Sequence, residues 1–271
     1  MLRDITLGQY YQADSVIHKL DPRVKLVATI TFIISLFVIK NVIGYCLAAV
    51  FLAIAVKLSK VPFRFMIKGM KAIFFILLIT VVFNLFLTPG EALITVWKLT
   101  ITKEGLQNAV FMTIRLVFLI IGSSVMTLTT TPNNLTDGME KLMKPLKFFR
   151  VPVHEVAMMM SIALRFIPVL MEETDKIMKA QIARGADFES GNLIKKAKSL
   201  VPLLVPLFIS AFRRANDLAM AMEARCYRGG EHRTKMKPLR YRKRDAAAYL
   251  TLAVYFAACI GINFIRIPII G

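Results

Sequence analysis

The feature that most constrains this chain is the separation of apolar from charged residues along it. Hydrophobic residues make up 56% of the sequence, whereas soluble domains average about 45–50%. The formal net charge is nevertheless +19. Both properties fit one chain only if long apolar runs alternate with charged segments. This pattern predicts helices that cross a lipid bilayer, joined by basic segments.

Five apolar runs are candidates for membrane-spanning helices. The first two are separated only by Lys40 and Asn41. Joined, they would form a helix of about 46 Å, which is longer than the roughly 30 Å core of a bilayer. Two short spans joined by a tight hairpin are therefore favoured. We place the five spans at 26–39, 42–56, 72–87, 109–128 and 246–265, the last within the segment 246–271.

The distribution of basic residues predicts the orientation. With the N-terminus in the cytoplasm, 31 of the 36 Lys and Arg residues fall in cytoplasmic segments, 22 of them between the fourth and fifth spans. Cytoplasmic loops are enriched in Lys and Arg, and short loops carry most of that signal. The short loop 57–71 alone holds five basic residues. We therefore expect a multi-pass cell-membrane protein whose C-terminus lies outside.

The long segment between the fourth and fifth spans has a helical pattern. Thr131 and Pro132 begin an amphipathic helix over 132–144, because Pro is well placed in a first helical turn. Two long helices, 152–184 and 193–226, begin apolar and become charged. The predicted fold class is all-α: a polytopic membrane protein with about five transmembrane helices and a cytoplasmic domain of long amphipathic helices. The expected parts are 1–128, 129–245 and 246–271.

Both long helices end in the same kind of tripeptide, a small residue, an arginine and another small residue. The two tripeptides are Ala183-Arg184-Gly185 and Ala224-Arg225-Cys226. Small neighbours leave a guanidinium uncrowded, so that its planar fork can hold a partner's carboxylate through two hydrogen bonds. The alternative is that each arginine caps its own helix, because a helix C-terminus attracts cations. The paired occurrence favours docking to partners.

These tripeptides, together with the N-terminal run Asp14-Ser15-Val16-Ile17-His18-Lys19-Leu20-Asp21-Pro22-Arg23-Val24-Lys25-Leu26, carry a resemblance to a known family. The chain resembles, over essentially its whole length, the transmembrane T component of energy-coupling factor (ECF) transporters, the family of EcfT and CbiQ. One difference is Cys226, where the family more usually has glycine. Both residues are small, so the expected helix end is retained.

The resemblance implies a coupling subunit of an ABC-type importer of vitamins or other micronutrients. Its cytoplasmic helices would dock Arg184 and Arg225 into grooves of two ABC ATPase subunits, EcfA-type and expected to form a heterodimer. Ala183, Gly185, Ala224 and Cys226 would permit the close approach. An interchangeable substrate-binding S component would be held by the membrane part and the upper face of the coupling domain. The chain itself would be no enzyme and carry no cofactor, since the ATPases bind ATP and Mg²⁺.

Other readings need features that the sequence lacks. A membrane enzyme acting on lipid or isoprenoid phosphates, the main alternative, would need a base or an acidic metal-binding motif, and there is no Asp-rich motif. A stand-alone channel would need polar residues in several spans, where Arg115 is the principal one. His154 has no second histidine four residues later, so a zinc site is not expected. The basic run 233–244 lies beside a span and favours anionic lipid over nucleic acid.

Overall fold

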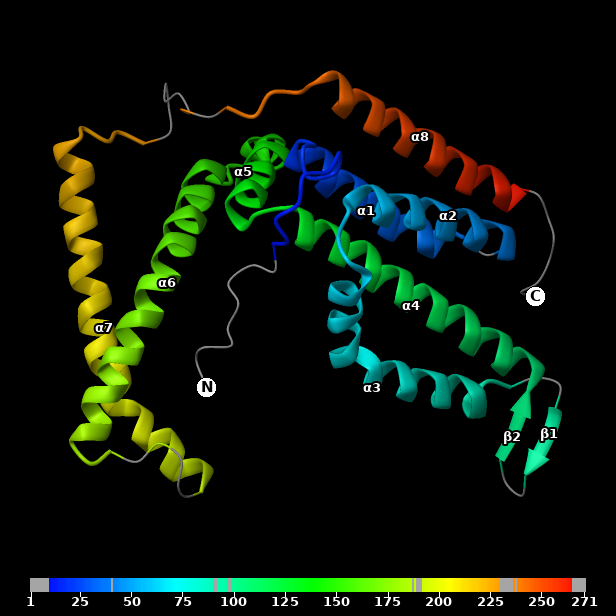
Figure 1. The fold of residues 1–271 in the computed structure, drawn as a ribbon, viewed down its shortest axis with the longest axis horizontal. Helices are drawn as coiled ribbons and strands as arrows, with labels where there is room; N and C mark the ends of the chain where they lie inside the picture. The colour runs from blue at the N-terminus through cyan, green and yellow to red at the C-terminus, as the bar shows by residue number, and fades with distance from the viewer. Residues whose placement is uncertain are drawn as a thin grey trace. The chain divides into compact units, whose positions relative to one another are not determined.

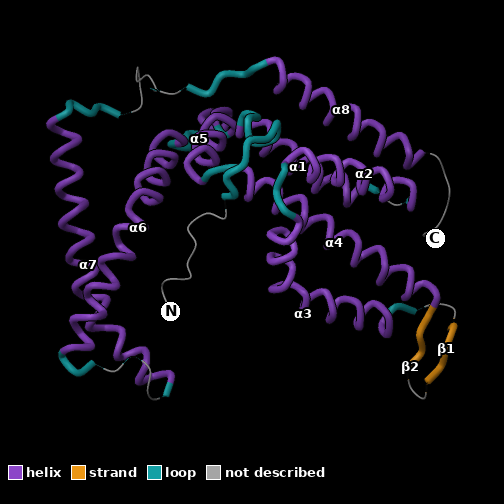
Figure 2. The backbone as a smooth tube through the Cα atoms, in the orientation of Figure 1, coloured by secondary structure: helices purple, strands orange, loops and turns teal. Residues whose placement is uncertain are grey.

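The computed structural model describes residues 10–39, 41–89, 92–96, 99–186, 188, 192–229, 236 and 238–264. Their regular structure is helical apart from one short β-hairpin, and loops and turns join these elements (Figures 1 and 2). The predicted all-α fold class is confirmed. The chain divides into two compact units: a membrane unit, Gly8–Gly138 with Leu239–Gly271, and a coupling unit, mainly Met139–Pro238. The assignment of these units to membrane and cytoplasm stays a prediction.

The membrane unit is built from both ends of the chain. Its long elements are α1 (Pro22–Val38), α2 (Val42–Ser59), α3 (Phe63–Leu87), α4 (Lys103–Thr129) and α8 (Lys243–Phe264). Helix α1 packs against α4 and α8, and α2 packs against the same two helices (Figure 1). Leu36, Ala48 and Cys259 are fully buried at the centre of this bundle. The last helix therefore completes the core that the first helices begin.

Polar side chains inside this bundle join its helices through hydrogen bonds. Ser35 donates to the carbonyl of Phe32 at 2.7 Å, and its hydroxyl lies 2.8 Å from the Tyr255 hydroxyl on α8. The Asn41 amide donates to the Ile262 carbonyl at 3.1 Å. Pairing of this kind is required where water is absent. Lys40, expected in the turn before α2, lies outside the described residues, as do the C-terminal residues 265–271.

Helix α3 is longer than the predicted span 72–87 that it contains. Figure 1 shows a bend in it, and its apolar part is Ile73–Phe86. This part exposes Phe74, Phe75 and Phe83, which suits a surface against lipid. A hairpin of β1 (Ala92–Val96) and β2 (Leu99–Thr102) then leads into α4. The Thr102 hydroxyl accepts from the Gly105 N–H at 3.0 Å and so caps α4.

Four described helices are long and apolar enough to cross a membrane: α2, α4, α8 and α6 (Val153–Ala183). Helix α1 has 17 residues and begins with Arg23 and Lys25, so its apolar length is short. Helix α6 is apolar enough only in its N-terminal half, and the sequence assigns that half to the cytoplasmic domain. About five spans remains consistent with these lengths, since a span needs roughly 20 apolar residues and shorter ones thin the bilayer.

The coupling unit consists of η2 (Lys144–Phe149), α6 and α7 (Leu193–Ala224), preceded by α5 (Pro132–Leu142), whose first residues belong to the membrane unit. Helices α6 and α7 run antiparallel where they pack, as Figure 1 shows. The Gln181 amide donates to the Pro202 carbonyl at 3.3 Å, and Arg214 pairs with Glu173 at 2.7 Å. Pro168, Pro202 and Pro206 lie inside these helices.

Candidate functional site

The C-terminus of α6 is a Schellman motif built around the first arginine tripeptide. The Gly185 N–H donates to the Ile182 carbonyl and the Ala186 N–H to the Gln181 carbonyl, both at 2.9 Å. This is the hydrogen-bond pattern of a helix that ends in one left-handed residue. That residue is Gly185, with φ of +87°, a conformation open to glycine at no steric cost. Arg184 is the last residue before the reversal.

Helix α7 ends in the same way. The Cys226 N–H donates to the Glu223 carbonyl at 2.8 Å and the Tyr227 N–H to the Met222 carbonyl at 3.0 Å. Cys226 holds the left-handed position at φ of +53°. The backbone of Arg225 (φ −92°, ψ 15°) closely matches that of Arg184 (φ −88°, ψ 5°). The two tripeptides are therefore equivalent in structure as well as in sequence.

The third residue of each tripeptide is thus small for a local reason. A left-handed backbone disfavours larger side chains, above all β-branched ones. Cysteine accepts this conformation at a cost of about 1–2 kcal/mol, whereas glycine does not pay it. The sequence argument attributed the small residue to close approach by a partner. The backbone conformation supplies a second cause that holds without any partner.

The two arginine side chains make no hydrogen bonds to the ends of their own helices within the described residues. Both are exposed, and in the described part of the chain neither makes a side-chain hydrogen bond or ion pair. The last carbonyls of α6 and α7 are satisfied by backbone N–H groups instead. The alternative in which each guanidinium caps its own helix therefore has no hydrogen bond to support it. Whether Arg184 and Arg225 bind partners stays a prediction.

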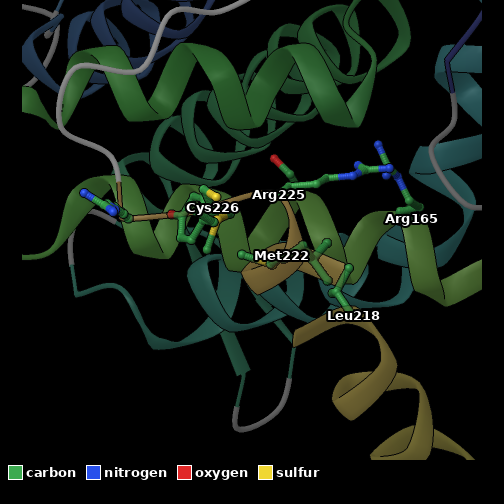
Figure 3. Close-up of a pocket in the computed structure, with 11 residues that line it drawn as sticks. Arg165, Leu218, Met222, Arg225 and Cys226 are labelled. Carbon is green, nitrogen blue, oxygen red and sulfur yellow. The ribbon is translucent and has the colours of Figure 1, made fainter. Parts of the chain in front are cut away.

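A groove lies beside the second arginine, within the coupling unit. Its volume is about 570 Å³, and it separates the N-terminal half of α6 from the end of α7 (Figure 3). In Figure 3 the Arg225 side chain extends toward Arg165 of α6, and Leu218 and Met222 lie below them. The lining residues are Met158, Ser161, Ile162, Arg165, Leu218, Met222, Arg225, Cys226, Tyr227, Arg228 and Gly229. Sequence reasoning did not single out Arg165.

Methionines of the coupling unit lie both inside and outside the groove. Met158 and Met222 line the groove, whereas Met159, Met160 and Met220 are exposed outside it. A thioether side chain is flexible and polarizable, so it can repack against different partners. Their placement on the surface of the coupling unit suits that role.

Helix α7 also exposes a continuous apolar stretch. Leu204, Phe208 and Phe212, one helical turn apart, have 44%, 61% and 68% of their surface exposed. Patches of this kind on a folded unit mark surfaces that a partner or a bilayer covers.

The N-terminal run forms a junction inside the membrane unit. Asp21 caps α1 by accepting from the Arg23 N–H at 2.9 Å, and the Arg23 guanidinium returns to the Asp21 carboxylate and lies 3.7 Å from the centre of the Tyr241 ring. The Asp21 N–H donates to the Asp245 carboxylate at 2.9 Å. Burial raises the pKa of Asp21, but the hydrogen bonds from Arg23 outweigh it and leave the pKa below its usual value.

Lys25 holds the other side of this junction. Its ammonium donates to the Thr129 carbonyl at the end of α4, 2.8 Å away, and to the His18 carbonyl at 3.2 Å. Burial lowers the pKa of Lys25 to about 8. His18 is oriented by Ser15 and by the Tyr11 carbonyl, and burial also lowers its pKa. The run therefore binds the end of α4 and the start of α8, a role that sequence reasoning missed because Asp245 is 224 residues from Asp21.

Two other candidates from the sequence have structural partners. Arg115 donates to the Tyr45 hydroxyl at 3.0 Å, which joins α4 to α2. His154 lies 3.0 Å from the Glu140 carboxylate. Among the described residues, no group of three or more His, Cys, Asp or Glu side chains could hold a metal ion. Residues 233–235 and 237 of the predicted lipid-binding run lie outside the described part.

Comparison with known proteins identifies the family. Residues 13–236 match the sequence model of CbiQ, described as a cobalt transport protein. The chain is 59% identical to a protein of Clostridium kluyveri over 264 residues, which cover 97% of both chains. It is 54% identical to one of Thermosediminibacter oceani over 97% of this chain and 100% of that one. A relative from Bacillus subtilis is 47% identical over 95% of this chain and 97% of its own.

These three relatives carry the same name, energy-coupling factor transporter transmembrane protein EcfT. Their name describes membrane components of transporters, and the helices of this chain that are long and apolar enough to span a bilayer agree with that class. The resemblance drawn from the N-terminal run and the two arginine tripeptides is confirmed. The chain belongs to the CbiQ family and, within it, to the transmembrane components of energy-coupling factor transporters.

Proposed function

We propose that this chain is the coupling subunit of an ECF-type importer of vitamins or other micronutrients, and that Arg184 and Arg225 dock it to two ABC ATPase subunits. One observation carries the proposal. The two long helices of the coupling unit end in equivalent Schellman motifs, each of which holds an exposed arginine without a partner in the described part of the chain.

The docking chemistry follows from the geometry of these ends. A helix that reverses at a fixed left-handed residue already holds its last residue in a defined backbone conformation, so little backbone entropy is lost when the arginine is bound. Each guanidinium would pair with a carboxylate in a groove of one ATPase. In this proposal ATP and Mg²⁺ bind to the ATPases, whose closure moves α6 and α7.

The exposed apolar stretch of α7 supports a second contact. A substrate-binding S component would cover Leu204, Phe208 and Phe212, together with the membrane unit, and would tip when the coupling helices move. Substitution of Phe208 and Phe212 by Asp is expected to release the S component while the ATPases still co-purify. Retention of the S component at the wild-type level would refute this contact.

The central experiment reverses the charge of both arginines. Arg184→Glu with Arg225→Glu is expected to abolish co-purification of the ATPases in mild detergent, because each carboxylate in the ATPase grooves would meet a like charge. The matched control is Lys179→Glu with Arg213→Glu, which changes the net charge equally at exposed positions on the same two helices. Membrane insertion should be unaffected in both. Wild-type recovery of the ATPases with the arginine double variant would refute the docking role.

The proposed orientation places the coupling unit in the cytoplasm. Cys226 is exposed and provides a native label. With Cys46 and Cys259 replaced by Ser, a membrane-impermeant maleimide should label Cys226 in inside-out vesicles and leave it unlabelled in right-side-out vesicles. The reverse pattern would contradict the orientation.

A further inference from the structure

The groove between α6 and the end of α7 is lined by positive charge, and the residues that line it include no acidic partner. Three arginines line it, Arg165, Arg225 and Arg228, and no lining residue is acidic. None of the three has an ion pair or side-chain hydrogen bond in the described part of the chain. Arg214, on the same helix as Arg225, is instead paired with Glu173 at 2.7 Å. The groove therefore gathers arginines without an acidic partner, whereas Arg214 nearby has one.

The rest of the groove is apolar. Met158 and Ile162 of α6 face Leu218 and Met222 of α7 across it. An occupant must therefore present both an apolar surface and negative charge. Carboxylates fit the arginines, because a guanidinium binds a carboxylate through two parallel hydrogen bonds. Methionine walls fit a protein segment, since they adjust to its side chains.

We propose that Arg165 and Arg225 together bind a partner segment that carries at least two carboxylates on an apolar face. This inference rests on the proposed function, since the segment belongs to the ATPase that docks at the second tripeptide. Arg165 then acts as a second docking residue on α6.

Binding of one partner by both Arg165 and Arg225 would change how the movement of that partner is transmitted to the helices. A partner held by Arg225 alone would pull on the tip of α7. A partner held by both would bind α6 as well, near its N-terminal end. Movement of the ATPase would then reach both long helices at the same point.

The test measures affinity of the purified ATPases for the full chain in detergent. Arg165→Gln removes the charge and keeps a shorter, polar side chain. It is expected to weaken binding about tenfold or more, as truncation of a close interfacial charge pair does. The matched control is Arg213→Gln, an exposed arginine of α7 outside the groove, which should leave the affinity within about twofold.

A double-mutant cycle separates this inference from the proposed function. If Arg165 and Arg225 bind the same segment, Arg165→Gln should cost much less in an Arg225→Gln background than alone. If Arg225→Gln weakens binding and Arg165→Gln behaves like Arg213→Gln, the two-arginine site is overturned and the docking role of Arg225 stands. If neither arginine substitution weakens binding, both proposals fail.

A lipid occupant is tested in the same series. Short-chain phosphatidylglycerol, with short-chain phosphatidylcholine as control, is titrated into the full chain in detergent micelles. If Arg165→Gln lowers binding of the anionic lipid and leaves ATPase affinity unchanged, the groove binds a headgroup and the protein-segment proposal is refuted.

Discussion

Asp245→Asn should loosen the membrane unit at the point where the first and last helices meet. Asp245 is 2% exposed, and its two carboxylate oxygens accept from two backbone N–H groups, that of Asp21 at 2.9 Å and that of Arg242 at 2.7 Å. The second bond resembles the acidic half of a capping box at the start of α8. The first bond joins α8 to the N-terminal run.

The magnitude follows from the number of acceptors. An amide has one oxygen where the carboxylate has two, so Asn leaves one of the two N–H groups facing an NH₂ donor. A buried donor without a partner costs about 1–3 kcal/mol. At about 1.4 kcal/mol per tenfold, the opening equilibrium of α8 should rise about 5- to 150-fold.

Cys259 provides the assay, because it lies on α8 and is fully buried. In a Cys46→Ser, Cys226→Ser background it is the single thiol. Its labelling rate by a maleimide in detergent micelles follows the opening equilibrium when reclosing is faster than labelling. Asp245→Asn should label about 5- to 150-fold faster than the parent. Asp217→Asn, at an exposed position, serves as control. Equal rates for the two variants would refute the role assigned to Asp245.

Three further predictions concern stability. The pKa of Lys25 is about 8 in the folded chain and 10.5 in the unfolded chain. Between these pH values the unfolded chain binds more protons, so the free energy of unfolding rises with pH. The rise is at most about 1.4 kcal/mol per pH unit. Lys25→Met should remove this rise, and melting temperatures of the two proteins from pH 7 to 10.5 that stay parallel would contradict it. Cys226→Gly should keep or raise the melting temperature, whereas Cys226→Val should lower it, because φ of residue 226 is +53°. A Val variant with the melting temperature of the parent would count against the left-handed conformation. Gly122→Ala places a Cβ 2.7 Å from the Phe32 ring and should cost about 1–3 kcal/mol, while Gly261→Ala, with open space around it, should not destabilise, as thermal unfolding of both would show.

The fold class and the ends of the long helices followed from local signals. Hydrophobic runs locate spans because the bilayer imposes one length on them. Gly185 located the end of α6 because glycine favours the left-handed conformation. The run Tyr227-Arg228-Gly229-Gly230, with its two glycines, located the end of α7. These signals operate over a few residues and are therefore visible in one sequence.

What the sequence could not provide depends on distant pairing. Asp245 looks like one acidic residue in a basic segment, and only the fold brings it to Asp21. Arg165 looks like an isolated charge in an apolar run, and only the antiparallel packing of α6 and α7 brings it to the groove beside Arg225. The hairpin at 92–102 was missed because its strands are short and are bounded by turn residues on one side only.

The bond between Asp21 and Asp245 closes a loop of the chain that contains the whole coupling unit. Closing so long a loop costs little more than closing a short one, because the entropy grows only with the logarithm of its length. The order of synthesis matters more. The acceptor for the Asp21 N–H and the hydroxyl partner of Ser35 both lie on α8, which is synthesised after the coupling unit. Until α8 is made, the first helices lack these contacts and their core is incompletely packed. A chain truncated before α8 should therefore be a target for membrane quality-control proteases.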